Sequence, residues 1–374
     1  MYNSFSKFDK SSKKLLQYIE TILLEKKWLK AASNSSSPQS ALQTKLVEKL
    51  LDQRIDRQIL RYNSIVVSLY GFFEEFIEEM LRRYAGALES CYDSYSELPQ
   101  KITNAHLGLT LKVLDARELP KYEGVLQPSR VVENLSRCLN GSRSFRLNHE
   151  AFAFHTSNFR WQVVDRCFNR LDVDNLSGQV FSTGEFQSYL SDIGQEPEQS
   201  SPTKEDALFP INNLAQRRNH VAHGESITHA DILSWDILEE YIGCFRAYSV
   251  GLLTVLKGAW CRHLATSKGI NIGKPIDVYN NEVVCLEVCD TDVEKGNLLI
   301  AAPSDNKAIY RGGRILRIEI NNKSVERAPA RRDGVKIGVQ VPFHASANQS
   351  FYVVPTEVME DVMISELRVF AKDG

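Results

Sequence analysis

The sequence predicts a helical domain followed by a small antiparallel β domain. As far as His263, apolar residues recur every three or four positions, which is the spacing of one face of an α-helix. After Gly269 the chain changes to short runs rich in β-branched residues, separated by Gly, Asn, Asp and Pro. We therefore expect a multidomain protein of the α-then-β kind, with a helical domain over 1–268 and a β domain over 269–374.

Polar breaks divide the helical part into segments. Residues 31–38 form a polar break after the first helix, and residues 192–206 form a polar loop before the last two helices. The stretch 65–77 is apolar on nearly all sides, so it is expected to be a central helix of a bundle. We expect helices over 11–30, over 41–89 as one long helix or two consecutive ones, and over 104–116, 129–140, 149–171, 182–190, 207–223 and 228–263.

The β part shows regular short strands with turn residues between them, which is typical of a small barrel. Between residues 314 and 320, Leu316, Ile318 and Ile320 alternate with charged residues, as in an antiparallel strand with one buried face. The expected strands cover 283–288, 298–301, 314–320, 335–341 and 351–354.

Composition narrows the possible functions. The net charge is −2, so nucleic acid would be bound through local basic patches. The first 14 residues lack the apolar segment of a signal peptide, and no apolar run reaches the ~18 residues of a membrane span. The seven cysteines are scattered without a CxxC pair, which favours buried thiols in a reducing compartment over a metal site. We expect a cytoplasmic protein with no membrane contact, no metal and no cofactor.

The run RNHVAHG at residues 218–224 carries the most chemistry in the sequence. Gly224 fits the end of the helix 207–223, and Thr228 with Asp231 fits the start of the next. Asn219 and His223 are four residues apart and share a helical face. The alternative is that His223 and Gly224 simply end the helix, with the histidine at the negative end of the helix dipole.

Arg218 falls on a mostly apolar stripe of the same helix, so its guanidinium needs an acceptor. Glu74 is the best candidate, because it lies on an otherwise apolar line of the central helix. The alternative is that Glu74 lies at the helix edge in water. Arg217 and His220 flank the motif as supporting residues, and a solvated histidine at a helix end is the alternative for His220.

The run resembles the signature of HEPN ribonucleases, which is an arginine, four to six residues and a histidine, often with a polar residue after the arginine. Here Arg218 and His223 bracket four residues and Asn219 is the polar one. The resemblance covers roughly 45–90 and 205–262, which leaves a helical insertion at about 95–205, and looks closest to bacterial toxin and defence branches. Some HEPN toxins have a tyrosine two residues after the histidine that an antitoxin modifies, and Glu225 stands at that position.

The resemblance implies metal-independent cleavage of RNA by attack of the 2′-OH. Such cleavage needs a base, an acid and positive charge on the phosphate. Histidine suits the first two roles and arginine the third. One histidine cannot occupy both sides of a phosphorus, and HEPN enzymes pair two motifs across a dimer cleft. We therefore expect a homodimer with Arg218, Asn219 and His223 as catalytic residues, and products with 2′,3′-cyclic phosphate ends.

The β domain, from about 273 to 355, resembles the second-domain barrel of translational GTPases. The resemblance rests on a lysine-glycine turn at 295–296, an isoleucine-rich strand at 314–320 and a glycine-valine-glycine strand at 334–338. It implies contact with transfer RNA or other translation-related RNA. A local RNA-facing patch would include Arg314, Arg317, Arg331 and Arg332, together with Arg311 and Arg327. The alternative is a solvated surface of mixed charge.

Three functions remain open at this point. The first is a dimeric ribonuclease of a toxin–antitoxin or antiphage defence system, with an antitoxin or defence protein as partner. The second is a catalytically silent HEPN scaffold that binds RNA or a protein through its barrel. The third is a latent effector that cuts only when triggered. Retention of all three motif residues argues against the silent scaffold.

Overall fold

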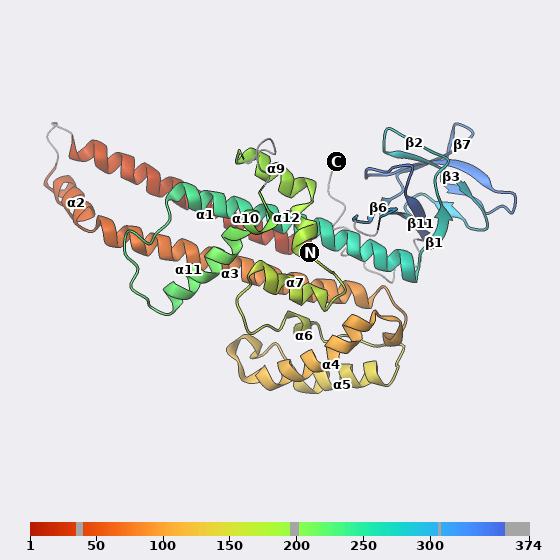
Figure 1. The fold of residues 1–374 in the computed structure, drawn as a ribbon, viewed down its shortest axis with the longest axis horizontal. Coiled ribbons are helices and arrows are strands. Elements are labelled where there is room, and N and C mark those ends of the chain that lie inside the picture. Colours follow the sequence, from red (N-terminus) through yellow and green to blue (C-terminus); the bar gives the residue numbers. More distant parts are fainter. Residues whose placement is uncertain (35–39, 195–201, 306–307, 356–374) are drawn as a thin grey trace.

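Three long helices form the body of the molecule. The computed structural model describes residues 1–34, 40–194, 202–305 and 308–355. Helices α1 (Tyr2–Ser33), α3 (Arg54–Glu89) and α12 (Trp235–Ser267) pack along one another, with α2 (Ala41–Asp52) at one end and the β strands at the other (Figure 1). The chain is therefore helical first and antiparallel β afterwards, as the sequence predicts.

Aromatic side chains fill the core between these helices. Phe73 of α3 meets Phe245 of α12 edge-on, with ring centroids 4.7 Å apart. Phe8 of α1 stacks on Phe76 of α3 at 5.2 Å. Such pairs add directional contacts to the burial of large apolar surfaces. The expected segment 41–89 is two helices, since Gln53 separates α2 from α3.

Helix α3 is a central helix of the bundle, as expected, since it packs on α1 and α12, but one of its faces is open. Leu60, Ser64, Val67 and Gly71 recur every three or four residues, so they share a face, and Leu60 and Val67 are 65% and 44% exposed. No atom lies within 4 Å of a Cβ built on Gly71. Apolarity in sequence does not show which side of a helix a neighbour covers.

Shorter helices fill the stretch between α3 and α12. The expected helix over 149–171 is broken, because residues 154–160 form a connecting loop that contains the polar run Thr156-Ser157-Asn158, whose side chains compete for backbone hydrogen bonds. The elements are η1 (Tyr95–Glu97), α4 (Gln100–Asp115), η2 (Ala116–Glu118), η3 (Pro120–Tyr122), α5 (Pro128–Leu139), α6 (His149–Ala153), α7 (Trp161–Asn169), α8 (Leu176–Phe181), α9 (Gly184–Asp192), α10 (Lys204–Ala207) and α11 (Phe209–Ala222).

The last helix starts later than expected. Thr228 and Asp231 do not cap it, because Asp231 accepts hydrogen bonds from the backbone and hydroxyl of Thr228 within the preceding loop. Ser234 is the N-cap, and its hydroxyl accepts from the backbone N–H of Ile237. The loop between α11 and α12 is thus longer than the sequence indicated.

The β part consists of three antiparallel sheets with the strand orders β1-β11-β5-β6, β2-β3-β10-β7-β8 and β4-β9. The expected closed barrel is not seen, since none of the described sheets closes on itself. The strands are β1 (Ile270–Gly273), β2 (Asp277–Tyr279), β3 (Val283–Val288), β4 (Val293–Glu294), β5 (Leu298–Ala302), β6 (Arg311–Arg314), β7 (Arg317–Ile320), β8 (Lys323–Val325), β9 (Arg327–Ala328), β10 (Val335–Gln340) and β11 (Ser350–Val354).

The expected strand over 314–320 is two strands. Ile315 and Leu316 separate β6 from β7, and each of these strands belongs to a different sheet. Leu316 is 47% exposed, whereas Ile318 is buried as expected. The predicted alternation of buried and exposed residues therefore holds within β7. It does not hold for Leu316, which precedes the first residue of β7.

The first sheet is a middle layer between α12 and the second sheet. Leu298 and Ile300 of β5 belong to the core of the helices, whereas Leu299 and Ala301 belong to the core of the β strands. All five residues of β5 are buried. Because successive strand residues point to opposite faces, β5 joins the two cores.

No described helix is long and apolar enough to cross a membrane.

Candidate active site

Helix α11 presents the RNHVAHG run and is fixed against α3 and α12. Its apolar residues Ile211, Leu214 and Ala215 are buried in the bundle. His223 is the C-cap, and Gly224 follows with a positive φ of 67°. Gly224 N–H donates to Val221 and Glu225 N–H donates to His220, so the helix ends in a Schellman motif. This ending leaves His223 exposed.

Arg217 is a structural residue of this region. Its guanidinium donates to the Tyr62 hydroxyl (2.8 Å), the Asn213 side chain (2.6 Å) and the backbone carbonyl of Asp231 (2.7 Å). These bonds tie α11 to α3 and to the loop that follows the motif. Arg217 therefore supports the site by fixing the loop and is not among the residues that line the groove described below.

Arg218 lies over the ring of Tyr70 on α3, with its Cζ 5.3 Å from the ring centroid. The expected ion pair with Glu74 is not among the contacts of the described residues. Glu74 instead accepts a hydrogen bond from the Tyr70 hydroxyl at 3.3 Å and lies 4.0 Å from His155. Arg218 is half-buried, so the aromatic face partly replaces the acceptor that a fully buried guanidinium would need.

Tyr70 also holds the loop 154–160. Its hydroxyl accepts a hydrogen bond from the backbone N–H of Phe159 at 2.9 Å. Burial raises the pKa of Tyr70, with the nearby Glu74 carboxylate adding to the effect, so the hydroxyl keeps its proton. The same loop meets α11, since the Asn158 side-chain amide donates to Asn219 Oδ1. Asn219 is thus held at the loop.

His155 anchors the start of this loop. Its Nδ1 lies 2.9 Å from the Ser157 carbonyl oxygen and its Nε2 lies 2.9 Å from Glu78 Oε1. These two contacts hold the ring between the loop and α3. Burial would raise the pKa of Glu78, but His155, Lys121 and Arg82 outweigh it and lower that pKa to about 2.

An open groove with a volume of about 690 Å³ runs between α7, α11 and the loop 154–160. Three sequence-predicted residues line it: Arg218, Asn219 and His223. Two further arginines, Arg160 and Arg166, line it as well. The remaining lining residues are Thr156, Ser157, Asn158, Gln162, Val163 and Asn212, so no carboxylate is among the described residues of the wall. Cationic and amide donors therefore converge on one space.

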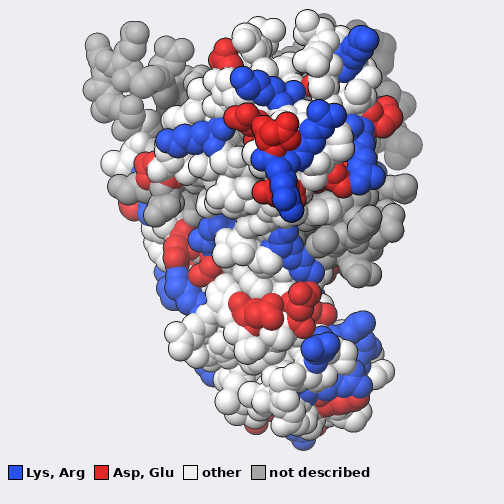
Figure 2. Space-filling view, turned by 90° about the vertical axis from the view of Figure 1, so that its right-hand side faces the viewer, with Lys and Arg blue, Asp and Glu red and all other residues white. Residues whose placement is uncertain are grey.

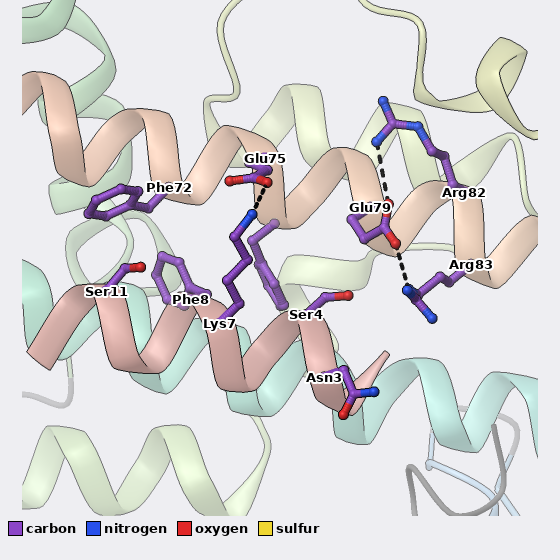
Figure 3. Close-up of a pocket in the computed structure, with 11 residues that line it drawn as sticks. Asn3, Ser4, Lys7, Phe8, Ser11, Phe72, Glu75, Glu79, Arg82 and Arg83 are labelled. Carbon is purple, nitrogen blue, oxygen red and sulfur yellow. Dashed lines mark hydrogen bonds and ion pairs between the residues drawn. The ribbon is translucent and has the colours of Figure 1, made fainter. Parts of the chain in front are cut away.

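A second groove, between α1 and α3, has a different charge balance (Figure 3). Its cations are paired: Lys7 with Glu75, and Arg83 with Glu79. Arg82 contacts Glu79 at 3.6 Å and also meets Glu78 and Glu150. Internal neutralisation leaves little positive charge for an anion, so this groove does not resemble a phosphate site.

The remaining predicted residues lie outside the groove. His220 is exposed and its Nδ1 is 3.5 Å from Glu225. On the β domain, Arg317 pairs with Glu319 at 2.7 Å, and the half-buried Arg314 donates to the Gly296 carbonyl.

Arg331 and Arg332 are exposed. Among the described residues they make no ion pair. At the β end of the molecule, basic and acidic side chains are interspersed (Figure 2), which matches the mixed-charge alternative.

Sequence reasoning missed Arg160, Arg166, Asn158, Tyr70 and His155. Four of these belong to the segment that was expected to be part of one helix, and Tyr70 reads as an ordinary core residue. The polar run at 156–158 was the one signal that a loop interrupts this segment. Within the described part of the chain, no group of three or more His, Cys, Asp or Glu side chains could hold a metal ion.

The helical body thus holds one polar groove in which arginines, amides and a histidine can contact a phosphate group. The protein-family model RiboL-PSP-HEPN matches residues 39–253, more than half of the chain. The chain therefore belongs to the RiboL-PSP-HEPN family. The match spans α3, the intervening helices, α11 and most of α12. No curated protein matches the chain.

Proposed function

We propose that this protein is a metal-independent endoribonuclease that cleaves RNA by attack of the 2′-OH on the adjacent phosphate. The observation that carries the proposal is the groove, in which Arg218, Asn219 and His223 meet two more arginines without a carboxylate among the described lining residues. Such a wall favours a phosphate and disfavours a divalent cation, whereas two-metal nucleases need several converging carboxylates. Membership of the HEPN family supports the same activity.

The residues have distinct roles in this proposal. The exposed His223 takes the 2′-OH proton as O2′ forms its bond to phosphorus, and the 5′ oxygen leaves with a proton from a second acid. Arg218, steadied by Tyr70, binds the charged phosphate oxygens. Asn219, held by Asn158, fixes the loop against α11. The products carry a 2′,3′-cyclic phosphate and a 5′-hydroxyl.

The second acid comes from a second copy of the chain in this proposal. Among the described residues, His223 is the one histidine that lines the groove, and a single imidazole cannot occupy both sides of a phosphorus. The exposed face of α3 formed by Leu60, Ser64, Val67 and Gly71 offers surface for such a partner, on a helix that also packs against α11. Light scattering should show a dimer, and a strict monomer that still cuts RNA would contradict this part.

The setting we propose is a bacterial toxin or antiphage defence system, on the strength of the RNHVAHG run. The β domain would select or position a translation-related RNA such as transfer RNA. An antitoxin or a sensor protein would be the partner. Induction in cells followed by sequencing of RNA ends would identify the RNA that is cut.

The central experiment is cleavage of an unstructured, end-labelled RNA in excess EDTA. Cleavage should persist, and an RNA with a 2′-deoxy residue at the cut position should resist because it lacks the internal nucleophile. His223→Ala should abolish cleavage without loss of thermal stability, since the side chain is exposed. Arg218→Ala should also abolish cleavage, with some loss of stability from the Tyr70 contact.

Two outcomes would overturn the proposed chemistry. One is inhibition by EDTA, and the other is equal cleavage of single-stranded DNA. Binding of RNA without any cleavage by the wild-type protein would instead point to the silent scaffold.

A further inference from the structure

Arg160 and Arg166 are the feature of the groove that the HEPN-like motif does not account for. Both are exposed and both line the groove with Arg218. Within the described residues neither forms an ion pair, whereas the three cations that line the α1–α3 groove all do. Unpaired guanidinium groups in a concave surface attract anions, because no internal carboxylate offsets their charge.

The backbone beneath Arg160 is fixed with respect to the motif. Arg160 is the N-cap residue of α7 and ends the loop 154–160. On either side of it, Phe159 N–H donates to Tyr70 and Trp161 N–H donates to Asn212 Oδ1 at 3.1 Å. Tyr70 also lies under Arg218, so one side chain contacts both the guanidinium of Arg218 and the backbone next to Arg160.

Arg166 extends the positive charge along α7. It stands six residues after Arg160, which corresponds to roughly 9 Å of helix axis. A single small anion would engage one end of such a row. A polyanion with regularly spaced phosphates can engage both arginines while another phosphate lies at Arg218.

The rest of the lining indicates which part of a polynucleotide is read. Among the described lining residues there is no Phe, Tyr or Trp side chain on which a base could stack. Hydroxyls, amides and arginines dominate the wall instead. Such donors suit phosphate and sugar oxygens, whereas sequence-tolerant base binding generally uses aromatic stacking.

We propose that Arg160 and Arg166 form a phosphate track that holds the RNA backbone on one side of the scissile phosphate and does not read the bases. This inference rests on the proposed ribonuclease function for the placement of the scissile phosphate at Arg218. The track itself is a binding site, so it can be tested without cleavage.

The test measures binding of an unstructured RNA oligonucleotide to the full chain carrying His223→Ala, over a range of salt concentrations. Adding Arg160→Gln and Arg166→Gln should lower the salt slope by about 1.4, since each single-strand phosphate contact contributes about 0.7. That loss corresponds to roughly 25-fold weaker binding at about 0.1 M salt. Oligonucleotides of uridine and of adenosine should bind within roughly threefold of each other if bases are not read.

The matched control is Arg130→Gln with Arg143→Gln. These arginines are also exposed, lie outside the groove and make no ion pair among the described residues. They should leave both affinity and salt slope unchanged, and thermal melts should show that both double variants fold.

Equal affinity and equal slope in the groove variant would overturn the track, as would a strong preference for one base or failure of the protein to bind RNA. Failure of the proposed function has a different signature. Wild-type protein would then bind RNA in a way that depends on Arg160 and Arg166 but would not cut it. Conversely, cleavage with a KM insensitive to these two arginines would preserve the ribonuclease and remove the track.

Discussion

At the scale of single residues, Tyr70 connects the three parts of the candidate site. Its ring supports Arg218, its hydroxyl donates to Glu74, and it accepts from the backbone of Phe159. The side chain is 1% exposed, so these groups have little access to water. Tyr70, which the sequence pattern indicates only as a core residue, therefore both packs in the core and positions Arg218 and the loop 154–160.

The substitution Tyr70→Phe should distinguish the contribution of the hydroxyl from that of the ring, because it removes the first and keeps the second. The ring can still lie under Arg218, but the Phe159 N–H loses its acceptor, which should cost about 1–3 kcal/mol of unfolding free energy. RNA cleavage should also fall, because the loop 154–160 lines the groove. Denaturant unfolding and cleavage kinetics measure the two effects.

The control is Tyr18→Phe, since Tyr18 is 40% exposed. It should change stability by less than about 0.5 kcal/mol. If Tyr70→Phe matched the wild type in both stability and kinetics, the Phe159 hydrogen bond would have no role in holding the loop.

At the scale of elements, the buried His106 fixes α4 to its neighbours. Its Nε2 accepts from the Asn148 backbone N–H at 3.0 Å, and its Nδ1 lies 3.3 Å from the Tyr95 hydroxyl. The ring stacks on Phe152 of α6 with centroids 5.8 Å apart. An Nε2 that accepts a hydrogen bond belongs to the neutral ring, so protonation would break this connection.

We predict that His106 makes the protein less stable in acid. Burial, with a smaller effect of His149, lowers its pKa from 6.5 to about 4. As pH falls through this interval the unfolded chain binds a proton that the folded chain does not, so stability is present above 6.5 and is lost towards 4. The loss should be on the order of 3 kcal/mol.

Unfolding free energies measured across this interval test the prediction. His106→Gln should be less stable than the wild type near neutral pH and should show a flatter pH dependence. His229→Gln changes an exposed histidine in the loop before α12 and should keep the wild-type slope. An unchanged slope in His106→Gln would contradict the assignment.

At the scale of the whole molecule, the β strands pack closely on the helical body. Gly258 of α12 lies directly against the segment before β6, where an added Cβ would be 2.1 Å from Ile309 Cγ2 and 2.8 Å from the Tyr310 carbonyl oxygen. A Cβ on Gly312 would be 2.8 Å from Cys261 Sγ. Glycine is needed at both positions because helix and strand approach so closely.

Gly258→Ala should therefore destabilise the protein by about 1–3 kcal/mol through overpacking. Gly71→Ala is the matched control, because it lies in an equally helical but open position and should stabilise by up to about 1 kcal/mol. Thermal unfolding of the two variants should shift in opposite directions. A neutral Gly258→Ala would show that the β strands dock more loosely on α12 than this packing indicates.

The sequence alone determined the order of the elements and the placement of the motif. Helical periodicity, polar breaks and glycine signals are local properties, so they predicted the α-then-β layout, the position of α11 and the end of that helix at His223–Gly224. The resemblance of the RNHVAHG run to the HEPN signature grouped Arg218, Asn219 and His223, and these three line one groove. Their catalytic roles remain a prediction.

Only the tertiary structure decided what surrounds that motif. The loop 154–160 contacts α11 through Asn158 and contacts α3 through Tyr70. The first contact joins residues that are 61 positions apart in the sequence, and the second joins residues that are 89 positions apart. The burial of both faces of β5 likewise depends on α12, and the missing closure of the barrel depends on how distant strands pair. Local sequence patterns do not predict such contacts. The contacts form between distant segments, and the packing of the whole chain decides which segments meet.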